Sequence, residues 1–141
     1  MSEIIVRDAE PLDLPAIQEL QIQGDILTGG RPMDMDDAGL RTKGDGWIFA
    51  VAEIDGRVIG FIHGERLSGN WAIAHYFAVR RDFRGTDVFR RLGQYFIEKS
   101  KTVGADHILA YADVGNPRLL NFYKYFGFNA GGTYVEMIKE I

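Results

Sequence analysis

Apolar and polar residues alternate along several stretches of the chain, which is the pattern of a strand with one buried face. Three such stretches come early, at residues 3–7, 47–54 and 57–67. The last two are joined by Asp55-Gly56, a dipeptide typical of tight hairpin turns because both residues tolerate a positive φ. The sequence therefore predicts an antiparallel hairpin over these two strands.

A fourth alternating stretch, residues 71–79, predicts another strand after the turn Ser68-Gly69-Asn70. Strict alternation would place on one face of this strand Trp71, Ile73, His75, Phe77 and Val79. Two further strands are predicted over residues 107–114 and 133–138.

Two segments, residues 11–23 and 87–103, instead repeat their apolar residues with the period of a helix, and a helix is also predicted over residues 117–126, whereas residues 24–46 indicate a loop that could contain a helix over residues 33–41. Residues 11–23 begin with a proline, which suits a first-turn position, and residues 33–41 form a shorter candidate inside a glycine-rich, acidic region. Residues 87–103 form the longest predicted helix, and residues 117–126 form the last. Antiparallel strands followed by a β-α-β-α-β order predict a mixed α/β sheet with one parallel step.

The composition limits the class of protein. With 141 residues, 46% of them hydrophobic, residues 1–141 are expected to form one domain with its own core. Neither a membrane span nor a signal peptide is recognisable, so we expect a soluble, cytoplasmic protein. The chain has no cysteine, which excludes disulfides and thiolate catalysis, and its three histidines lack the spacing of a metal site. A net charge of −4 argues against broad affinity for nucleic acids.

The segment VRRDFRGTDVFRRL, residues 79–92, joins a strand to a helix through an Arg-Gly turn. The start of a helix can hold a phosphate through its N–H groups and the positive end of its dipole. Five arginines crowd this segment: Arg80, Arg81, Arg84, Arg90 and Arg91. Such a cluster is often only a solvated face, so both interpretations stay open.

The segment NPRLLNFYKYFGF, residues 116–128, places a tyrosine on a helix that ends at Gly127-Phe128. In their order and separation, these two segments resemble the acetyl-CoA-binding core of the GNAT superfamily of N-acetyltransferases, and the order of elements is similar from Ile4 to Lys139. The resemblance implies a mixed, mostly antiparallel sheet of six to seven strands with helices on both faces. It also implies acetyl-CoA as co-substrate and no metal.

The resemblance assigns positions that bind the cofactor. In the family, the strand equivalent to residues 71–79 carries a bulge, and pantetheine pairs with its backbone, here at Phe77, Ala78 and Val79. The next turn commonly reads Arg/Gln-x-x-Gly-x-Gly/Ala and closes on the pyrophosphate. The aligned residues are Arg84, Gly85, Thr86, Asp87, Val88 and Phe89. The family's asparagine and tyrosine correspond to Asn116 and Tyr123.

Two residues depart from the family pattern. Asp87 and Phe89 stand where small residues are expected. A carboxylate at a helix N-terminus caps the N–H groups and so competes with a phosphate, and a phenylalanine adds bulk where backbone access is needed. The neighbouring arginines could still bind phosphate from the side.

The implied reaction is direct transfer, in which an amine attacks the thioester carbonyl. Tyr123 would assist the departing thiolate by donating a proton, although it could instead be a core aromatic residue, and Tyr125 lies nearby. The candidates for the general base are Glu65, His75, His63 and Asp113, acting singly or together through water.

Two functions from different classes follow. The first is an N-acetyltransferase that acetylates an amine on a small molecule or a protein. The second is a catalytically inactive GNAT-fold protein with a binding or structural role, which Asp87 and Phe89 would favour. No nucleic-acid or membrane partner is expected, and whether the chain forms a homodimer stays open.

Overall fold

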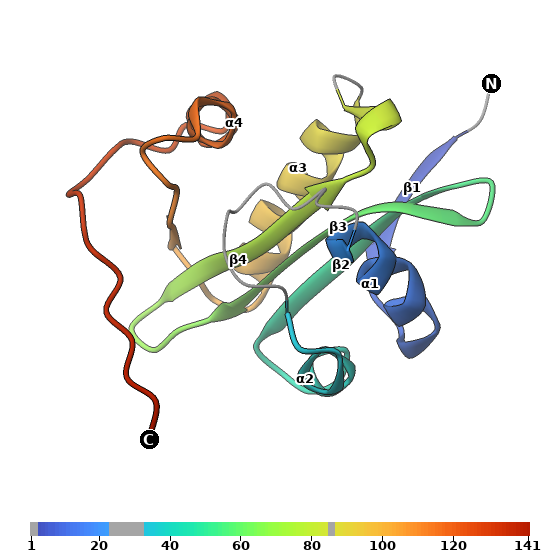
Figure 1. The fold of residues 1–141 in the computed structure, drawn as a ribbon, viewed down its shortest axis with the longest axis horizontal. Coiled ribbons are helices and arrows are strands. Elements are labelled where there is room, and N and C mark those ends of the chain that lie inside the picture. The colour runs from blue at the N-terminus through green and yellow to red at the C-terminus, as the bar shows by residue number, and fades with distance from the viewer. Residues whose placement is uncertain (1–2, 23–32, 85–86) are drawn as a thin grey trace.

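The computed structural model describes residues 3–22, 33–84 and 87–141. In this part of the chain, five strands form one sheet in the order β1-β2-β3-β4-β5 (Figure 1). The strands are β1 (Ile4–Asp8), β2 (Trp47–Ile54), β3 (Arg57–Arg66), β4 (Trp71–Val79) and β5 (His107–Ala110). Strands β1 to β4 pair antiparallel with their neighbours, and β5 pairs parallel to β4.

Helices cover both faces of this sheet. They are η1 (Pro11–Asp13), α1 (Leu14–Ile22), α2 (Met35–Leu40), η2 (Arg81–Phe83), α3 (Asp87–Thr102) and α4 (Pro117–Tyr125). Apolar residues of α1 and α2 form one core with the sheet, and those of α3 and α4 form a second core on its other face. The predicted mixed sheet with helices on both faces is confirmed, whereas the predicted six to seven strands are not found in the described residues.

Local sequence signals account for most of the element boundaries. Asp55 and Gly56 have φ of 51° and 77°, the positive values that a tight two-residue hairpin requires. Asp34 caps α2, since its side chain accepts hydrogen bonds from the backbone of Asp36 and Asp37 at 2.9 and 3.1 Å. The long helix α3 is followed by Gly104 with a φ of 91°. These boundaries agree with the predictions.

A β-bulge interrupts the pairing of β3 with β4. Tyr76 pairs with His63 and Ala74 pairs with Gly64, so His75 is an extra residue without a partner of its own in β3. An extra residue in one strand kinks that strand and increases its twist. The bulge therefore redirects β4 halfway along its length.

The bulge also changes which side chains share a face. Ala72 and Ala74, before the bulge, and Phe77 and Val79, after it, all belong to the core beneath α3 and α4. The predicted single face of alternating residues from Trp71 to Val79 is therefore wrong, because a residue inserted at the bulge shifts the alternation by one position.

The strand predicted over residues 107–114 is shorter in the structure and ends at Ala110. The following residues form a turn in which Asp113 Oδ1 accepts a hydrogen bond of 2.7 Å from the backbone N–H of Gly115. An aspartate that binds the backbone two residues later favours a turn over a strand.

The strand predicted over residues 133–138 is wrong for this structure. Residues 129–141 contain no regular secondary structure, and each of them is exposed. Figure 1 shows them as an extended segment that leaves α4. A strand requires a neighbouring backbone for its hydrogen bonds, and these residues have no ladder partner in the described part of the chain.

Candidate active site

The pairing of β4 with β5 ends before β4 itself does. Their pairing stops at Ala74 with Ala110, whereas β4 continues to Val79. Beyond Ala74, no described strand lies on the side of β4 that faces away from β3. The bulge at His75 lies where the separation begins. The second half of β4 thus presents backbone polar groups that an extended ligand could use.

The predicted contacts on β4 lie in this half of the strand. The side chains of Phe77, Ala78 and Val79 are buried, so only their backbone can meet a ligand. The Val79 carbonyl already accepts a hydrogen bond of 3.2 Å from Arg84 Nε. Arg84 therefore folds back over the end of β4.

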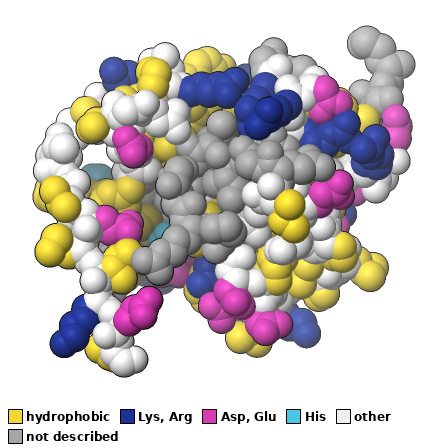
Figure 2. Space-filling view, in the orientation of Figure 1, with side chains coloured by type: hydrophobic (Ala, Val, Ile, Leu, Met, Phe, Trp, Pro, Cys, Tyr) yellow, Lys and Arg dark blue, Asp and Glu magenta, His cyan; other side chains and the backbone are white. Residues whose placement is uncertain are grey.

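Basic residues surround the end of β4. Figure 2 shows Lys and Arg side chains along the upper edge of the molecule, the end at which β4 finishes. The guanidinium of Arg80 binds the Asp82 carboxylate at 2.5 and 3.0 Å. Of the predicted phosphate turn, Gly85 and Thr86 lie outside the described residues.

The two departures from the family pattern have distinct surroundings. Asp87 is the first residue of α3, and its carboxylate lies 3.4 Å from Arg90 Nε at the exposed surface. The ring of Phe89 packs against Phe77 and Phe122, at centroid distances of 5.2 and 6.1 Å, within the core beneath α4. The neighbouring Val88 is fully buried.

Tyr123 lies on the buried face of α4. Asn116 caps this helix by accepting a hydrogen bond of 3.2 Å from the Leu119 N–H, which fixes where the helix starts. The Tyr123 ring contacts Phe122 and Phe128 and is only 7% exposed. Burial raises the pKa of Tyr123 to about 12, so its hydroxyl keeps its proton near neutral pH.

Tyr125 differs clearly from Tyr123 in its surroundings. It is 67% exposed and contacts Phe126 at the surface of α4. Of the two tyrosines that the sequence left as alternatives, only Tyr123 lies in the core that α4 shares with β4.

A histidine and a carboxylate meet at the bulge. His75 Nε2 lies 3.7 Å from Glu65 Oε2, and each side chain is about one-third exposed. Burial lowers the pKa of His75, while the nearby Glu65 carboxylate opposes that shift. His75 is therefore largely neutral near pH 7 and can accept a proton.

His63 is stacked against His75 but is chemically different. It is fully buried between Trp47 and His75, with ring centroids 5.7 Å away on each side. Neither ring nitrogen of His63 has a hydrogen-bond partner in the described part of the chain. Burial lowers the pKa of His63 to about 3, so it stays neutral and serves as a packing surface for His75.

The four candidate bases have different surroundings. Glu65 and His75 lie together at the bulge, and the ring of His63 stacks against His75. Asp113 holds the turn after β5 through its bond to Gly115. Trp47, which the sequence did not indicate as a site residue, completes the ring stack and itself lies beneath the Arg41 guanidinium at 5.1 Å.

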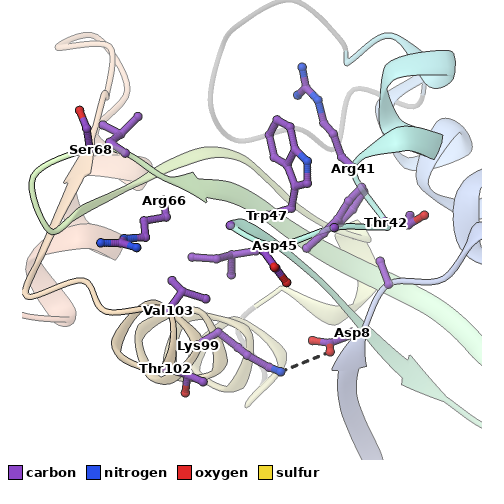
Figure 3. Close-up of a pocket in the computed structure, with 16 residues that line it drawn as sticks. Asp8, Arg41, Thr42, Asp45, Trp47, Arg66, Ser68, Lys99, Thr102 and Val103 are labelled. Atoms are coloured by element: carbon purple, nitrogen blue, oxygen red, sulfur yellow. Dashed lines mark hydrogen bonds and ion pairs between the residues drawn. The ribbon is translucent and has the colours of Figure 1, made fainter.

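A hollow of about 720 Å³ lies where β3 passes into β4, and both Arg41 and Trp47 of the ring stack line it. Figure 3 shows Lys99 of α3 pointing across it to Asp8, and the Nζ–Oδ2 distance is 3.2 Å. None of the predicted site residues lines this hollow.

No group of three or more potential metal ligands occurs among the described residues. None of the described helices has the length and apolar character needed to cross a membrane.

The chain belongs to the GNAT family of acetyltransferases. The family model described as "Acetyltransferase (GNAT) family" matches residues 16–128, which include β2 to β5, the bulge and α4. The match confirms the family that the two sequence segments suggested. A search of the curated proteins found no match.

Solved structures share the fold at low sequence identity. An aminoglycoside N-acetyltransferase AAC(6')-Iy in complex with CoA is 18% identical with a TM-score of 0.84, covering 100% of this chain and 97% of that one. The ribosomal-protein-S18-alanine N-acetyltransferase from Escherichia coli is 18% identical with a TM-score of 0.75, covering 92% and 80%. A transcriptional regulator from Bacillus halodurans C-125 is 21% identical with a TM-score of 0.79, covering 97% and 100%.

Proposed function

We propose that this GNAT protein is an active N-acetyltransferase that moves an acetyl group from acetyl-CoA directly to an amine. The observation that carries the proposal is the separation of β4 from β5 at His75, with the Glu65–His75 pair beside it. A binding protein would need only the exposed backbone of β4. A transferase also needs a group that accepts a proton, and the Glu65–His75 pair lies where the two strands separate.

Acetyl-CoA would supply the activated thioester, and the chain would hold and orient it. Backbone groups of Phe77, Ala78 and Val79 are the proposed contacts for the pantetheine, since they follow the point of separation. The proposed contacts for the phosphates and the rest of the cofactor are Arg84, Gly85, Thr86, Asp87, Val88, Phe89, Asn116 and Tyr123. The arginines near the end of β4 support this assignment through their charge.

The proposed base is His75, and Glu65 is proposed to orient it and keep its pKa from falling further. A neutral imidazole can take the proton that the attacking amine releases. The proposed acid is Tyr123, whose phenol stays protonated near neutral pH and can donate to the departing thiolate. His75 must be unprotonated to act as the base, and Tyr123 must be protonated to act as the acid. The lowered pKa of His75 and the raised pKa of Tyr123 favour these two states.

The acceptor is proposed to be an amine of a small molecule or of a protein. The similar structures named above are, by name, an aminoglycoside N-acetyltransferase and a ribosomal-protein-S18-alanine N-acetyltransferase. Both named acceptors carry amines, and this agreement supports the reaction class without choosing between the two kinds of acceptor. A cytoplasmic location and a single domain over residues 1–141 stay predictions from the sequence.

Exchange of Tyr123 for phenylalanine tests the catalytic proposal. Tyr123→Phe keeps the ring and its packing but removes the hydroxyl, so turnover should fall roughly 100-fold. Released CoA can be followed with a thiol reagent over a panel of amines, because the chain has no cysteine to react. Tyr125→Phe is the matched control and should keep full turnover. Equal losses in both variants, or none in either, would contradict the assignment of Tyr123.

The alternative is a GNAT-fold protein that does not catalyse transfer. It is kept because Asp87 and Phe89 stand where the family has small residues that let the backbone approach the pyrophosphate. Thermal unfolding with acetyl-CoA separates the cases in two steps. A rise in melting temperature shows preferential binding to the folded state, and CoA release with an amine shows transfer. Binding without release under any amine of the panel would favour the inactive alternative.

A further inference from the structure

The guanidinium of Arg41 lies over one end of the ring stack that leads to the proposed base. Arg41 follows α2, and its Cζ lies 5.1 Å from the centre of the Trp47 ring. From Trp47 the stack continues through the buried His63 to His75, with 5.7 Å between successive ring centres. A positive charge therefore lies at one end of the stack, and the Glu65–His75 pair lies at the other.

The backbone of Arg41 is fixed by the end of α2. Its N–H donates to the carbonyls of Asp37 and Ala38 at 3.0 and 3.1 Å, which closes the last turn of that helix. Figure 3 shows the Arg41 side chain next to the Trp47 ring, on the side of the sheet away from Lys99. The guanidinium is therefore positioned before a ligand arrives, which lowers the entropic cost of binding to it.

No carboxylate forms an ion pair with Arg41 among the described residues. Arg7, by contrast, binds the carboxylates of Asp13 and Glu53 at 2.8 and 3.0 Å. Figure 3 shows Asp45, in the loop after Arg41, pointing to the opposite side from the guanidinium. A half-buried guanidinium has five N–H donors in a planar fork that matches a carboxylate or a phosphate. Arg41 is therefore suited to bind an anionic group of a ligand.

The charge of Arg41 also acts on the two histidines of the stack. Burial lowers the pKa of His63 and of His75, and the positive charge of Arg41 lowers both pKa values further. Coulomb interactions weaken with distance, so Arg41 and the proposed base belong to one site.

We propose that the acceptor is an amine that also carries a negatively charged group, a carboxylate or a phosphate, which Arg41 binds while the amine lies at His75. This inference rests on the proposed function, because it names the class of acceptor for that reaction. Trp47 belongs to β2 and His75 to β4, so the two ends of the stack are two strand spacings apart, roughly 10 Å. An extended peptide of three residues spans about this length. A short peptide with a free carboxyl end is therefore a suitable model acceptor.

Acetylation of triglycine and of triglycinamide tests the preference for a negative charge. The two peptides share the same amine and length, but only triglycine carries a carboxylate. Transfer forms an amide at that amine and releases CoA, which a thiol reagent detects. We expect kcat/KM to be roughly 10- to 100-fold higher for triglycine, mainly through KM, because hydrogen bonds to charged groups have this effect. Gly-Gly-aminomethylphosphonate, with a phosphonate in place of the carboxylate, shows which anion is preferred.

Substitution of Arg41 tests its role in this preference. In Arg41→Gln, the ratio of kcat/KM for the two peptides should fall to about 1. The ratio is the readout because loss of this charge also affects the pKa of His75, which acts on both peptides alike. Arg41→Lys keeps the charge without the planar fork and should keep part of the preference. Lys43→Gln, which removes an exposed cation of the same loop, is the matched control and should keep the full ratio.

A binding experiment tests the same site without turnover. The chain has two tryptophans, so Trp71→Phe leaves Trp47 as the only indole fluorophore. With CoA present, triglycine should change the fluorescence of Trp47 saturably, and triglycinamide should need a concentration at least roughly tenfold higher. Addition of Arg41→Gln to this variant should remove the difference between the two peptides.

Two kinetic results would overturn the inference. One is a protein that acetylates triglycinamide as well as triglycine and its phosphonate analogue, which leaves the proposed function in place. The other is a preference that Arg41→Gln does not reduce. If no amine is acetylated, the proposed function fails, and the fluorescence titration decides on the anion site: equal responses to the two peptides, or none, overturn it. Each variant's melting temperature and its shift with acetyl-CoA show whether its fold is intact.

Discussion

The buried histidine in the ring stack should make this protein sensitive to acid. His63 has a pKa of about 3 in the folded state because burial disfavours its charged form. In the unfolded chain its pKa is about 6.5. As the pH falls below 6.5, the unfolded state takes up a proton that the folded state refuses, so the free energy of unfolding decreases.

The size of the effect follows from the two pKa values. At pH 5 nearly every folded molecule still carries a neutral His63, while most unfolded molecules carry a charged one. Integrating the difference in bound protons from pH 8 to pH 5 gives a loss of about 2 kcal/mol from this residue alone. The lowered pKa of His75 acts in the same direction over the same range. The lowered pKa of Asp13 contributes only at lower pH, as its carboxylate protonates.

Substitution isolates the contribution of His63. His63→Leu is close in volume and removes both unpartnered nitrogens and the titration. Urea unfolding at pH 8, 7, 6 and 5 should show that wild type loses about 2 kcal/mol more than this variant. His107→Gln is the control, since it removes a histidine that is exposed at the surface.

A parallel pH dependence of the free energy of unfolding in wild type and His63→Leu would refute this role of His63. If wild type and His63→Leu lose the same stability between pH 8 and pH 5, then His63 is either solvated or hydrogen-bonded in the folded state. An equal change in His107→Gln would instead show that the difference does not come from burial.

Three further substitutions test the bulge, the phosphate turn and the base. Gly64→Ala should destabilise the fold by at least about 3 kcal/mol in urea unfolding, because its Cβ would lie 2.0 Å from the Ile73 carbonyl oxygen. Asp87→Gly should tighten CoA binding in calorimetry if the carboxylate competes with the phosphate. Glu65→Gln should lower turnover and shift the acid limb of kcat/KM to lower pH, because the carboxylate raises the pKa of His75.

Each of these has a control and a contrary result. Gly131→Ala, with open space around its Cβ, should change stability by less than about 0.5 kcal/mol, and a large loss there would discredit the comparison with Gly64. Unchanged or weaker CoA affinity in Asp87→Gly would show that its pairing with Arg90 keeps the carboxylate away from the phosphate. Asp113→Asn should leave the acid limb in place, and an equal shift would remove Glu65 from its role.

Sequence alone determined the features that depend on neighbouring residues. The Asp55-Gly56 turn needs only two residues that accept a positive φ, and α3 and α4 follow from apolar residues at helical spacing. Asn116 starts α4 whatever lies around it, because its side chain binds the helix's own backbone. The family resemblance used the same local segments, and for that reason it identified the family correctly.

Tertiary structure alone decided how distant residues meet. The family resemblance implied a bulge in this strand, but its position at His75 depends on the pairing with β3 and cannot be predicted from the alternation of β4 alone. Burial between Trp47 and His75 separates His63, which cannot hold a proton near neutral pH, from His75, which can accept one, although both are histidines on neighbouring strands. Residues 133–138 have the sequence of a strand, but a strand forms only where another backbone bonds to it, and these residues have no such partner in the described part of the chain.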